Sequence, residues 1–439
     1  MSIPSTSAPS TYRPFRWFVL ATLLVVTATT ALALICPAPL VGVIGDSYPE
    51  LSTGQVTWMT MGTFNLFVAF AALGGGYFVD RLGFLKIYAI GSTLILAGWL
   101  LVPVIGEDYW GMVFIRLFQG VGTGPIMASA ASVAARYFPV GERGIVTGTQ
   151  GAAMSLGLAV GVSLVPALND AAGDWQVVLR NLWPAAALAL IMTAVVAFGP
   201  SAAPVAGTAA KAPAPASQRV AFRAALLNPL TWVAVGCVVL LSWVYQAFND
   251  LTPGYLTLDE PKGLGLEHGS ALLVWAQLAN MVGALVCGMV TERVFRGRVR
   301  PGIILGFLFG TIGGAGLLLP AVKSSQVFLI AVLVLAGFFY AWINPNAIAY
   351  IAKNYPEHIT GKLGGLAMGI GIFGGTAGVA AGSAALHATD RYVLSIIIMC
   401  LVGIVGLVVA LALRQASDRR QASDRRQAPG AVAAAGPPA

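Results

Sequence analysis

Arg116 is the residue of this sequence whose chemistry fits its surroundings least well. It lies six residues into an apolar stretch that begins near Trp110, roughly 9 Å along a helix that rises 1.5 Å per residue. A buried cation is costly and usually faces a watery cavity or a partner. Because no deep acid nearby in the sequence is an evident mate, Arg116 is predicted to face a cavity and attract anions. The alternative is that its side chain reaches out to lipid headgroups.

Uncharged amide side chains occur in a subset of the apolar stretches. Amides inside apolar helices need hydrogen-bond partners, so they collect at helix–helix contacts or around a wet cavity. For any single amide these two explanations are equally good, but the uneven distribution favours a shared cavity. The predicted substrate-cavity residues are Arg116, Gln119, Asn65, Gln150, Gln246, Asn249, Gln277, Asn280, Asn344 and Asn346.

Two acids, Asp46 and Asp250, are candidates to carry a coupled proton. Each precedes a proline by three residues, and the two positions are 204 residues apart. A carboxyl group that couples a proton must gain access to each side of the membrane in turn. A plain loop acid would instead cap a helix or a turn, and the sequence leaves both interpretations open for both residues.

Catalytic and metal chemistry are not indicated. The histidines His268, His358 and His387 do not cluster, and the four cysteines lie far apart in apolar stretches. The GxxxxGK[ST] sequence that would bind ATP is missing. We therefore expect no enzyme activity, no metal and no cofactor, and we expect transport to draw on a gradient of protons or another solute.

These residues must be positioned within lipid. Hydrophobic residues make up 57% of the 439 residues and charged residues 10%, whereas soluble domains carry about 25% charged residues. The composition excludes a soluble enzyme, a disordered chain, a disulfide scaffold and a nucleic-acid-binding domain. Twelve apolar runs are long enough to cross a bilayer as helices. They cover about 16–44, 56–78, 87–105, 110–135, 145–168, 179–199, 229–249, 269–291, 302–320, 326–352, 363–386 and 391–413.

The basic residues predict the orientation. With twelve spans, 20 of the 25 Lys and Arg residues but 6 of the 17 acids fall on one side, which the positive-inside rule makes cytoplasmic. We expect a monomer in a bacterial cytoplasmic membrane with both termini cytoplasmic. The predicted parts are an N-terminal tail (1–15), a six-helix half (16–200), a cytoplasmic linker rich in Ala, Pro and Ser (201–228), a second six-helix half (229–413) and a disordered tail (414–439).

The two halves repeat one another. The sequence GYFVDR at 76–81 is echoed by GMVTER at 288–293, 212 residues later, and RYFP at 136–139 by KNYP at 353–356, 217 residues later. Ordered matches at slowly growing offsets indicate a duplicated unit. Many secondary transporters use such repeats to place one site between two moving halves. The predicted fold class is an all-α membrane protein of twelve transmembrane helices in two pseudo-symmetric six-helix halves.

Three motifs resemble the major facilitator superfamily. GYFVDRLGFLK at 76–86 resembles its loop signature, and RLFQGVGTG at 116–124 resembles its fourth-span signature. YFPVGERGIVTG at 137–148 resembles the loop before the fifth span of its organic-anion symporters. The resemblance extends over about 16–413 and implies alternating access around a central cavity. The sequence departs from the family pattern after Gly83, where Phe84 and Leu85 precede Lys86 in place of basic residues.

The resemblance also implies a gate. The loop after the second span would hold the cytoplasmic side closed in one state and release it in the other. Glycine gives the tight turn its backbone freedom, and an aspartate can accept hydrogen bonds from a neighbouring helix N-terminus. The alternative is that these charges only set the topology. The predicted gating residues are Gly76, Asp80, Arg81 and Gly83, with Glu292 and Arg293 as their echo.

The sequence therefore predicts a secondary transporter of a small solute. An organic anion such as a carboxylate is the preferred cargo because of Arg116. A proton-coupled exporter of drug-like compounds is the first alternative, since the fourth-span signature occurs there too. A membrane sensor or assembly protein that does not transport is the second alternative.

The orientation can be tested by cysteine labelling. With twelve spans, single cysteines placed in 201–220 or after residue 414 will react with an impermeant maleimide only from the cytoplasmic side. Cysteines placed in 251–266 will react only from outside. Labelling of the linker from outside contradicts the span count.

Overall fold

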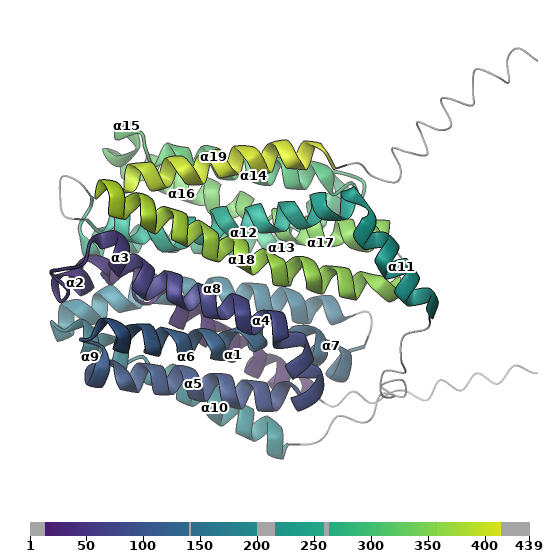
Figure 1. Cartoon of the computed structure of the whole chain (residues 1–439), viewed down its shortest axis with the longest axis horizontal. Coiled ribbons are helices and arrows are strands. Elements are labelled where there is room, and N and C mark those ends of the chain that lie inside the picture. The colour runs from purple at the N-terminus through teal and green to yellow at the C-terminus, as the bar shows by residue number, and fades with distance from the viewer. Residues whose placement is uncertain (1–13, 140–141, 200–215, 259–262, 356, 414–439) are drawn as a thin grey trace, which may run out of the picture.

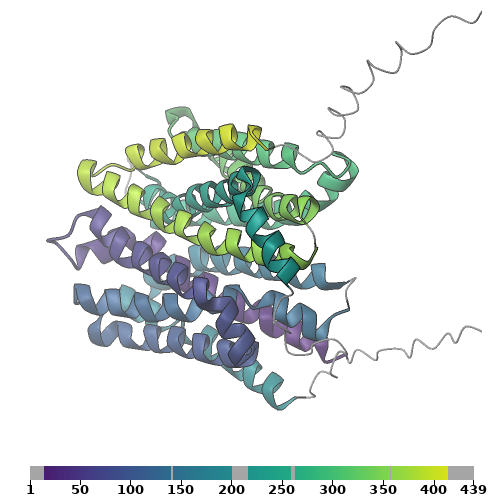
Figure 2. The same cartoon turned by 45° about the vertical axis from the view of Figure 1, so that its right-hand side comes forward.

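The computed structural model describes residues 14–139, 142–199, 216–258, 263–355 and 357–413. Within these ranges the regular elements are all helices. Figures 1 and 2 show them as two layers, with the N-terminal half from purple to blue and the C-terminal half from teal to yellow. Both views show α18 of the second half lying along α4 of the first.

The N-terminal half begins at Arg16. Some predicted spans of this half consist of two or more consecutive short helices. Its elements are α1 (Arg16–Ile35), η1 (Ala38–Leu40), α2 (Val41–Asp46), α3 (Thr53–Thr57), η2 (Trp58–Gly62), α4 (Thr63–Leu82), α5 (Phe84–Ile105), α6 (Tyr109–Met127), α7 (Ala130–Tyr137), α8 (Arg143–Ala172), α9 (Trp175–Arg180) and α10 (Trp183–Phe198).

The C-terminal half is preceded by α11 (Ala216–Leu227), which forms the described part of the predicted linker. This part of the linker is helical. The half itself consists of α12 (Pro229–Leu256), α13 (Leu266–Arg293), α14 (Arg300–Gly316), α15 (Pro320–Lys323), α16 (Gln326–Tyr340), α17 (Ile343–Asn354), α18 (Glu357–Thr389) and α19 (Tyr392–Leu411).

Ten of the twelve predicted spans correspond to helical segments of the described residues that are long and apolar enough to cross a membrane. The other two predicted spans also have helical counterparts. The fourth is α6, which has 19 residues and carries Arg116, and the ninth is α14, which has 17 residues. The structure thus has the all-helical, two-half architecture that the sequence predicts.

Corresponding spans of the two halves are interrupted at corresponding places. The fourth span breaks after Met127, where α6 ends and α7 follows from Ala130. The tenth span breaks after Tyr340, and α17 follows from Ile343. Each break lies near a proline, Pro125 before the first and Pro345 after the second, which removes a backbone donor from the helix. The breaks are 213 residues apart, consistent with the duplication.

The halves are in close contact at the end of the bundle that carries α3, which we call the α3 end (Figure 1). A Cβ atom on Gly54 would overlap the carbonyl oxygen of Ser383 and the backbone nitrogen of His387 on α18. Ser52, the N-cap of α3, places its Oγ 2.5 Å from His387 Nδ1. Only a residue without a side chain permits this approach between the two backbones.

The halves separate toward the opposite end, which carries α11 and which we call the α11 end. On α8, Ser155 hydrogen-bonds to the C-terminal half. Side chains built at Gly151 and Gly148, on the same face and closer to the α11 end, would meet nothing within 4 Å. On α18, Gly369 still faces α4, but Gly365 one turn earlier also faces open space. The described conformation is therefore closed at the α3 end and open at the α11 end.

The contact at Gly54 generates a prediction about this closure. Gly54→Val will hold α3 and α18 apart, because relieving such an overlap costs about 1–3 kcal/mol. A cysteine at Ser383, in a background without the native cysteines, will then react roughly tenfold faster with an impermeant thiol reagent. Gly42→Val is the matched control, because a Cβ there meets nothing within 4 Å. Equal labelling rates in the two variants would contradict the proposed seam.

Candidate functional site

Arg116 of α6 is enclosed by protein and is 2% exposed. Its Nη1 donates to the carbonyl oxygen of Ala33 at 2.7 Å, and its Nη2 donates to that of Leu34 at 3.1 Å. Its Nε donates to the carbonyl oxygen of Thr60. The guanidinium also lies 4.4 Å from the ring centre of Phe64. Arg116 therefore joins α1, η2, α4 and α6 into one unit.

The carbonyls that Arg116 binds come from interrupted helices. Pro37 follows α1 and has no N–H to donate to the carbonyl of Ala33, four residues earlier. Thr60 lies in η2, a π-helical turn whose wider spacing changes the hydrogen-bond pattern. Gln119, one turn after Arg116, contributes a side-chain acceptor at 2.7 Å. The buried cation thus receives its partners from backbone oxygens and one amide.

Asp250 of α12 is 1% exposed and meets the N-terminal half directly. Asn65 of α4 donates through Nδ2 to Asp250 Oδ2 at 2.9 Å, and Gln246 of α12 donates through Nε2 to Oδ1 at 2.9 Å. Among the described residues, Asp250 and Arg116 are the only charged side chains that are buried. They interact electrostatically, and Asn65 follows Phe64, on which the Arg116 guanidinium lies.

A second polar contact joins the halves without an acid. Ser155 of α8 donates to Asn280 Oδ1 of α13 at 3.0 Å, and Asn280 Nδ2 donates to the carbonyl oxygen of Gly337 at 3.1 Å. Tyr245 of α12 reaches the same Asn280 oxygen at 3.4 Å. This cluster and the Asp250 contact both lie between the closed α3 end and the open α11 end.

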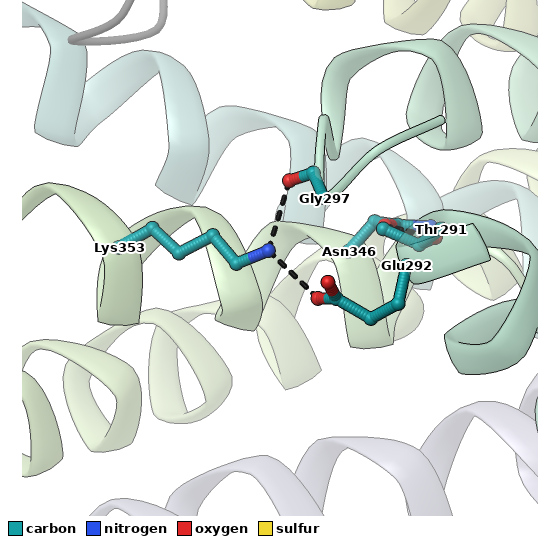
Figure 3. Close-up of polar contacts among 5 residues, drawn as sticks. All are labelled: Thr291, Glu292, Gly297, Asn346 and Lys353. Atoms are coloured by element: carbon teal, nitrogen blue, oxygen red, sulfur yellow. Dashed lines mark hydrogen bonds and ion pairs between the residues drawn. The ribbon is translucent and has the colours of Figure 1, made fainter. Parts of the chain in front are cut away.

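The remaining predicted cavity residues occupy several environments. Asn249 accepts a hydrogen bond from Gln277 at 2.6 Å, next to the Asn280 cluster along α12 and α13. Gln150 is partly buried and donates to the carbonyl oxygen of Met127 at 3.3 Å. Asn344 is partly buried. Asn346 instead joins α17 to α13 by accepting a hydrogen bond from Thr291 at 2.9 Å (Figure 3).

The predicted gating residues of the C-terminal half form contacts within that half. Lys353 of α17 donates to Glu292 Oε1 and to the carbonyl oxygen of Gly297, both at 2.8 Å (Figure 3). This exposed ion pair ties the end of α13 to α17. Arg293 is exposed beside it. The pair braces one half and does not cross to the other.

The corresponding loop of the N-terminal half follows α4. Gly83 has φ = 81°, a conformation that favours glycine, and it makes the turn into α5. Arg81 donates to the hydroxyl of Tyr77 at 3.0 Å. Gly76 and Asp80 lie on α4, but the surroundings of these two residues are outside the described part of the structure.

The two proton candidates have different positions. Asp46 is exposed at the end of α2, whereas Asp250 is buried inside α12. The chain still contributes buried side chains after Pro37, including Val41 and Ile44, and Asp46 is exposed as the last residue of α2. Asp250 is retained inside because α12 continues six residues beyond it. The structure therefore brings one of the two acids to the contact between the halves.

Sequence reasoning did not find three members of the site. Ser155, Tyr245 and Phe64 carry a hydroxyl or an aromatic ring, and these are common in apolar helices. Ser155 could have been found from its spacing. It lies on the same helix face as Gly151 and Gly148, at the end of a row of small residues of the kind that lets helices pack closely.

Comparisons with known proteins agree with this architecture. Residues 18–313 and 263–435 match the family model of the Major Facilitator Superfamily. The chain is 26% identical over 310 residues to the 3-(3-hydroxy-phenyl)propionate transporter of Escherichia coli K12, covering 70% of this chain and 72% of that one. It is 23% identical over 332 residues to the gentisate transporter of Corynebacterium glutamicum, covering 74% and 72%.

The solved structure of a D-xylose–proton symporter superposes with a TM-score of 0.68 at 16% identity, covering 91% of this chain and 97% of the other. At that identity the likeness shows the fold alone. The family-model match, which covers most of the chain, shows that the chain belongs to the Major Facilitator Superfamily. The chain is thus a multi-pass membrane protein of a family of secondary transporters.

The enclosure of Arg116 generates a prediction about stability. Arg116→Lys keeps the charge but cannot reach three carbonyls from different directions. Each buried carbonyl left without a donor costs about 1–3 kcal/mol, so the melting temperature in detergent should fall clearly. Arg391→Lys, at an exposed helix N-cap, is the control and should melt like the wild type. Unchanged melting of Arg116→Lys would mean that these backbone contacts contribute little.

Proposed function

We propose that this protein is a proton-coupled symporter of a small organic anion, with aromatic carboxylic acids as the leading class of substrate. The observation that carries the proposal is a buried acid, Asp250, at the contact between two halves that open on one side, together with a buried cation of the N-terminal half, Arg116, that acts on it electrostatically. These are the parts that a gradient-driven carrier of anions requires.

The opposite charges of Arg116 and Asp250 would couple the binding of a proton to the binding of an anion. When Asp250 is ionised, its negative charge compensates the field of Arg116. When Asp250 carries a proton, the positive charge of Arg116 is uncompensated in a medium of low dielectric constant, and an anion entering the open space is attracted. Proton and anion therefore favour each other's binding, which is the condition for symport.

The amide cluster supports an acid that carries further polar groups. Asn280, Tyr245 and Ser155 offer neutral donors and acceptors within one contact, and Asn249 and Gln277 extend them. The named relatives transport aromatic acids with ring hydroxyl groups, namely a hydroxyphenylpropionate and gentisate. We propose that Arg116 acts on the carboxylate through its field, since its donors are bound to the protein, and that the neutral cluster reads the ring substituents.

The orientation and the division of the chain belong to the same proposal. We place the α11 end at the cytoplasm of a bacterial cell, because Arg16, Arg81 and Arg293 lie at helix ends there. The described conformation then faces inward. The boundaries 16–200 and 229–413 for the two halves follow from the repeat, and we propose that a monomer is the transporting unit.

Transport by reconstituted protein tests the function. In liposomes with an inward gradient of about one pH unit, one-to-one symport will accumulate a labelled hydroxybenzoate up to about tenfold, since RT ln 10 is about 1.4 kcal/mol. Asp250→Asn will lose the gradient-driven accumulation but retain exchange of substrate. Asp46→Asn, at the exposed acid, is the matched control and should accumulate like the wild type.

Other outcomes distinguish the alternatives. Proton-driven movement of a cationic or neutral drug-like compound, without transport of any acid, would favour the exporter. Binding of an acid without its movement would favour a sensor. Equal loss of accumulation in Asp250→Asn and Asp46→Asn would remove Asp250 from its special role.

A further inference from the structure

We propose that Asn65 is the residue through which the N-terminal half responds to the proton on Asp250, so that proton occupancy sets how firmly the two halves hold together. This inference rests on the proposed proton-coupled transport and deepens it by naming the structural link. The carboxyl belongs to α12 of one half, and its partner Asn65 belongs to α4 of the other.

The two oxygens of Asp250 have partners of different origin. Gln246, one helical turn earlier on α12, donates to Oδ1 at 2.9 Å and moves with the same half. Asn65 donates to Oδ2 at 2.9 Å from across the contact. An ionised carboxylate accepts both bonds, and hydrogen bonds to an ionised group are roughly twice as strong as neutral ones. The ionised acid therefore ties the halves together through Asn65.

A proton on Asp250 weakens that tie wherever it resides. On Oδ2 it would set an O–H against the N–H of Asn65. The Asn65 amide is held in its orientation, because Nδ2 also donates to the carbonyl oxygen of Met61 at 3.0 Å. On Oδ1 the proton can be accepted by Gln246 after its amide reverses, and the bond from Asn65 to Oδ2 then loses its charge assistance. In both cases the contact that weakens is the one between the halves.

Few other charges act on this contact. Arg116 of α6 acts on Asp250 electrostatically, and Cys36 lies beside Arg116. Tyr245 is on α12 itself and bonds to Asn280. The described parts of α11, α13, α14, α17, α18, α19 and η1, which pack against α12, contribute no buried charged side chain. The protonation state of Asp250 is therefore the charge change that Asn65 experiences directly.

The neighbouring contact supplies a control built into the fold. Ser155 and Asn280 also join the halves, at 3.0 Å, but neither carries a charge that titrates. Removing that bond weakens the contact at every pH. Removing Gln246 alters the surroundings of Asp250 without cutting a bond between the halves. Of the three, only removal of Asn65 takes away the hydrogen bond that joins the acid to the opposite half.

The experiment follows closure at the α3 end as a function of pH. The probe is a single cysteine at Ser383, in the cysteine-free background, labelled by an impermeant thiol reagent at pH 5 and pH 8, with rates corrected for the thiolate fraction of an exposed reference cysteine. The parent will label roughly tenfold faster at the lower pH, the factor expected for losing about 1.4 kcal/mol of a charge-assisted bond. Asn65→Leu will label at a rate independent of pH, whereas Gln246→Leu and Ser155→Ala will retain the dependence.

A transport measurement accompanies the labelling. Asn65→Leu will exchange a labelled hydroxybenzoate at equilibrium but will not accumulate it against a proton gradient, because the proton no longer biases the two conformations. Asp46→Asn, at the exposed acid, is the transport control and will do both. If the leucine variant does not fold, as judged by its elution from a sizing column in detergent, Asn65→Ala is used in its place.

The outcomes are separable. Retained pH dependence and retained accumulation in Asn65→Leu would overturn the inference. A pH-independent parent would also overturn it. If the wild type moves no organic acid but its labelling depends on pH through Asn65, the proposed function fails while the link between Asp250 and Asn65 stands.

Discussion

The burial of one arginine is the constraint on which the N-terminal half depends. A guanidinium has five N–H donors and cannot shed its charge, so its surroundings must provide acceptors where regular helices have none to spare. The chain meets this requirement by interrupting α1 at Pro37 and by widening the helix at η2. Irregular backbone of this kind is tolerated at membrane depth where its polar groups are bound by protein. The site and the helix breaks are therefore one feature.

The duplication gives the two halves the same helices but different chemistry. The fourth span carries Arg116, while the corresponding part of the tenth span, near 333–336, has no basic residue. The buried acid belongs to the other half, since Asp250 of the C-terminal half is buried and its counterpart Asp46 of the N-terminal half is exposed. Among the described residues, the buried positive charge thus belongs to one half and the buried negative charge to the other, and their electrostatic attraction acts between the halves.

Much of the fold follows from the sequence because hydrocarbon leaves few choices. Long apolar runs had to be helices, and the repeat fixed their grouping into halves. The positions of Pro125 and Pro345 near the breaks, and of Gly83 in its turn, are local consequences of backbone chemistry. These features depend on residues close together in the chain.

The composition of the site was harder to predict because it depends on contacts between distant residues. The equivalence of Asp46 and Asp250 in sequence concealed that α2 ends at the exposed Asp46, whereas α12 continues six residues beyond the buried Asp250. Arg116 was predicted to face a cavity and attract an anion, and its role toward a substrate stays a prediction. In the structure its donors bind carbonyl oxygens of residues 56 to 83 positions away in the sequence. The periodicity of apolar residues along the sequence carries no information about contacts between residues so far apart.

The strength of the contacts at each end decides whether the protein can cycle. A seam of many strong bonds would hold one conformation permanently, since a shift between states needs a difference of only a few kcal/mol. At the α3 end the structure uses close backbone packing at Gly54 and two exposed hydrogen bonds, one between Ser52 and His387 and one from Thr53 to Asp390. Packing of this kind is lost within a small displacement. The hydrogen bond between Asn65 and Asp250 lies deeper between the halves. In the mechanism that we propose, a proton on Asp250 weakens this deeper bond, and the contacts at the closed end are then few enough to break.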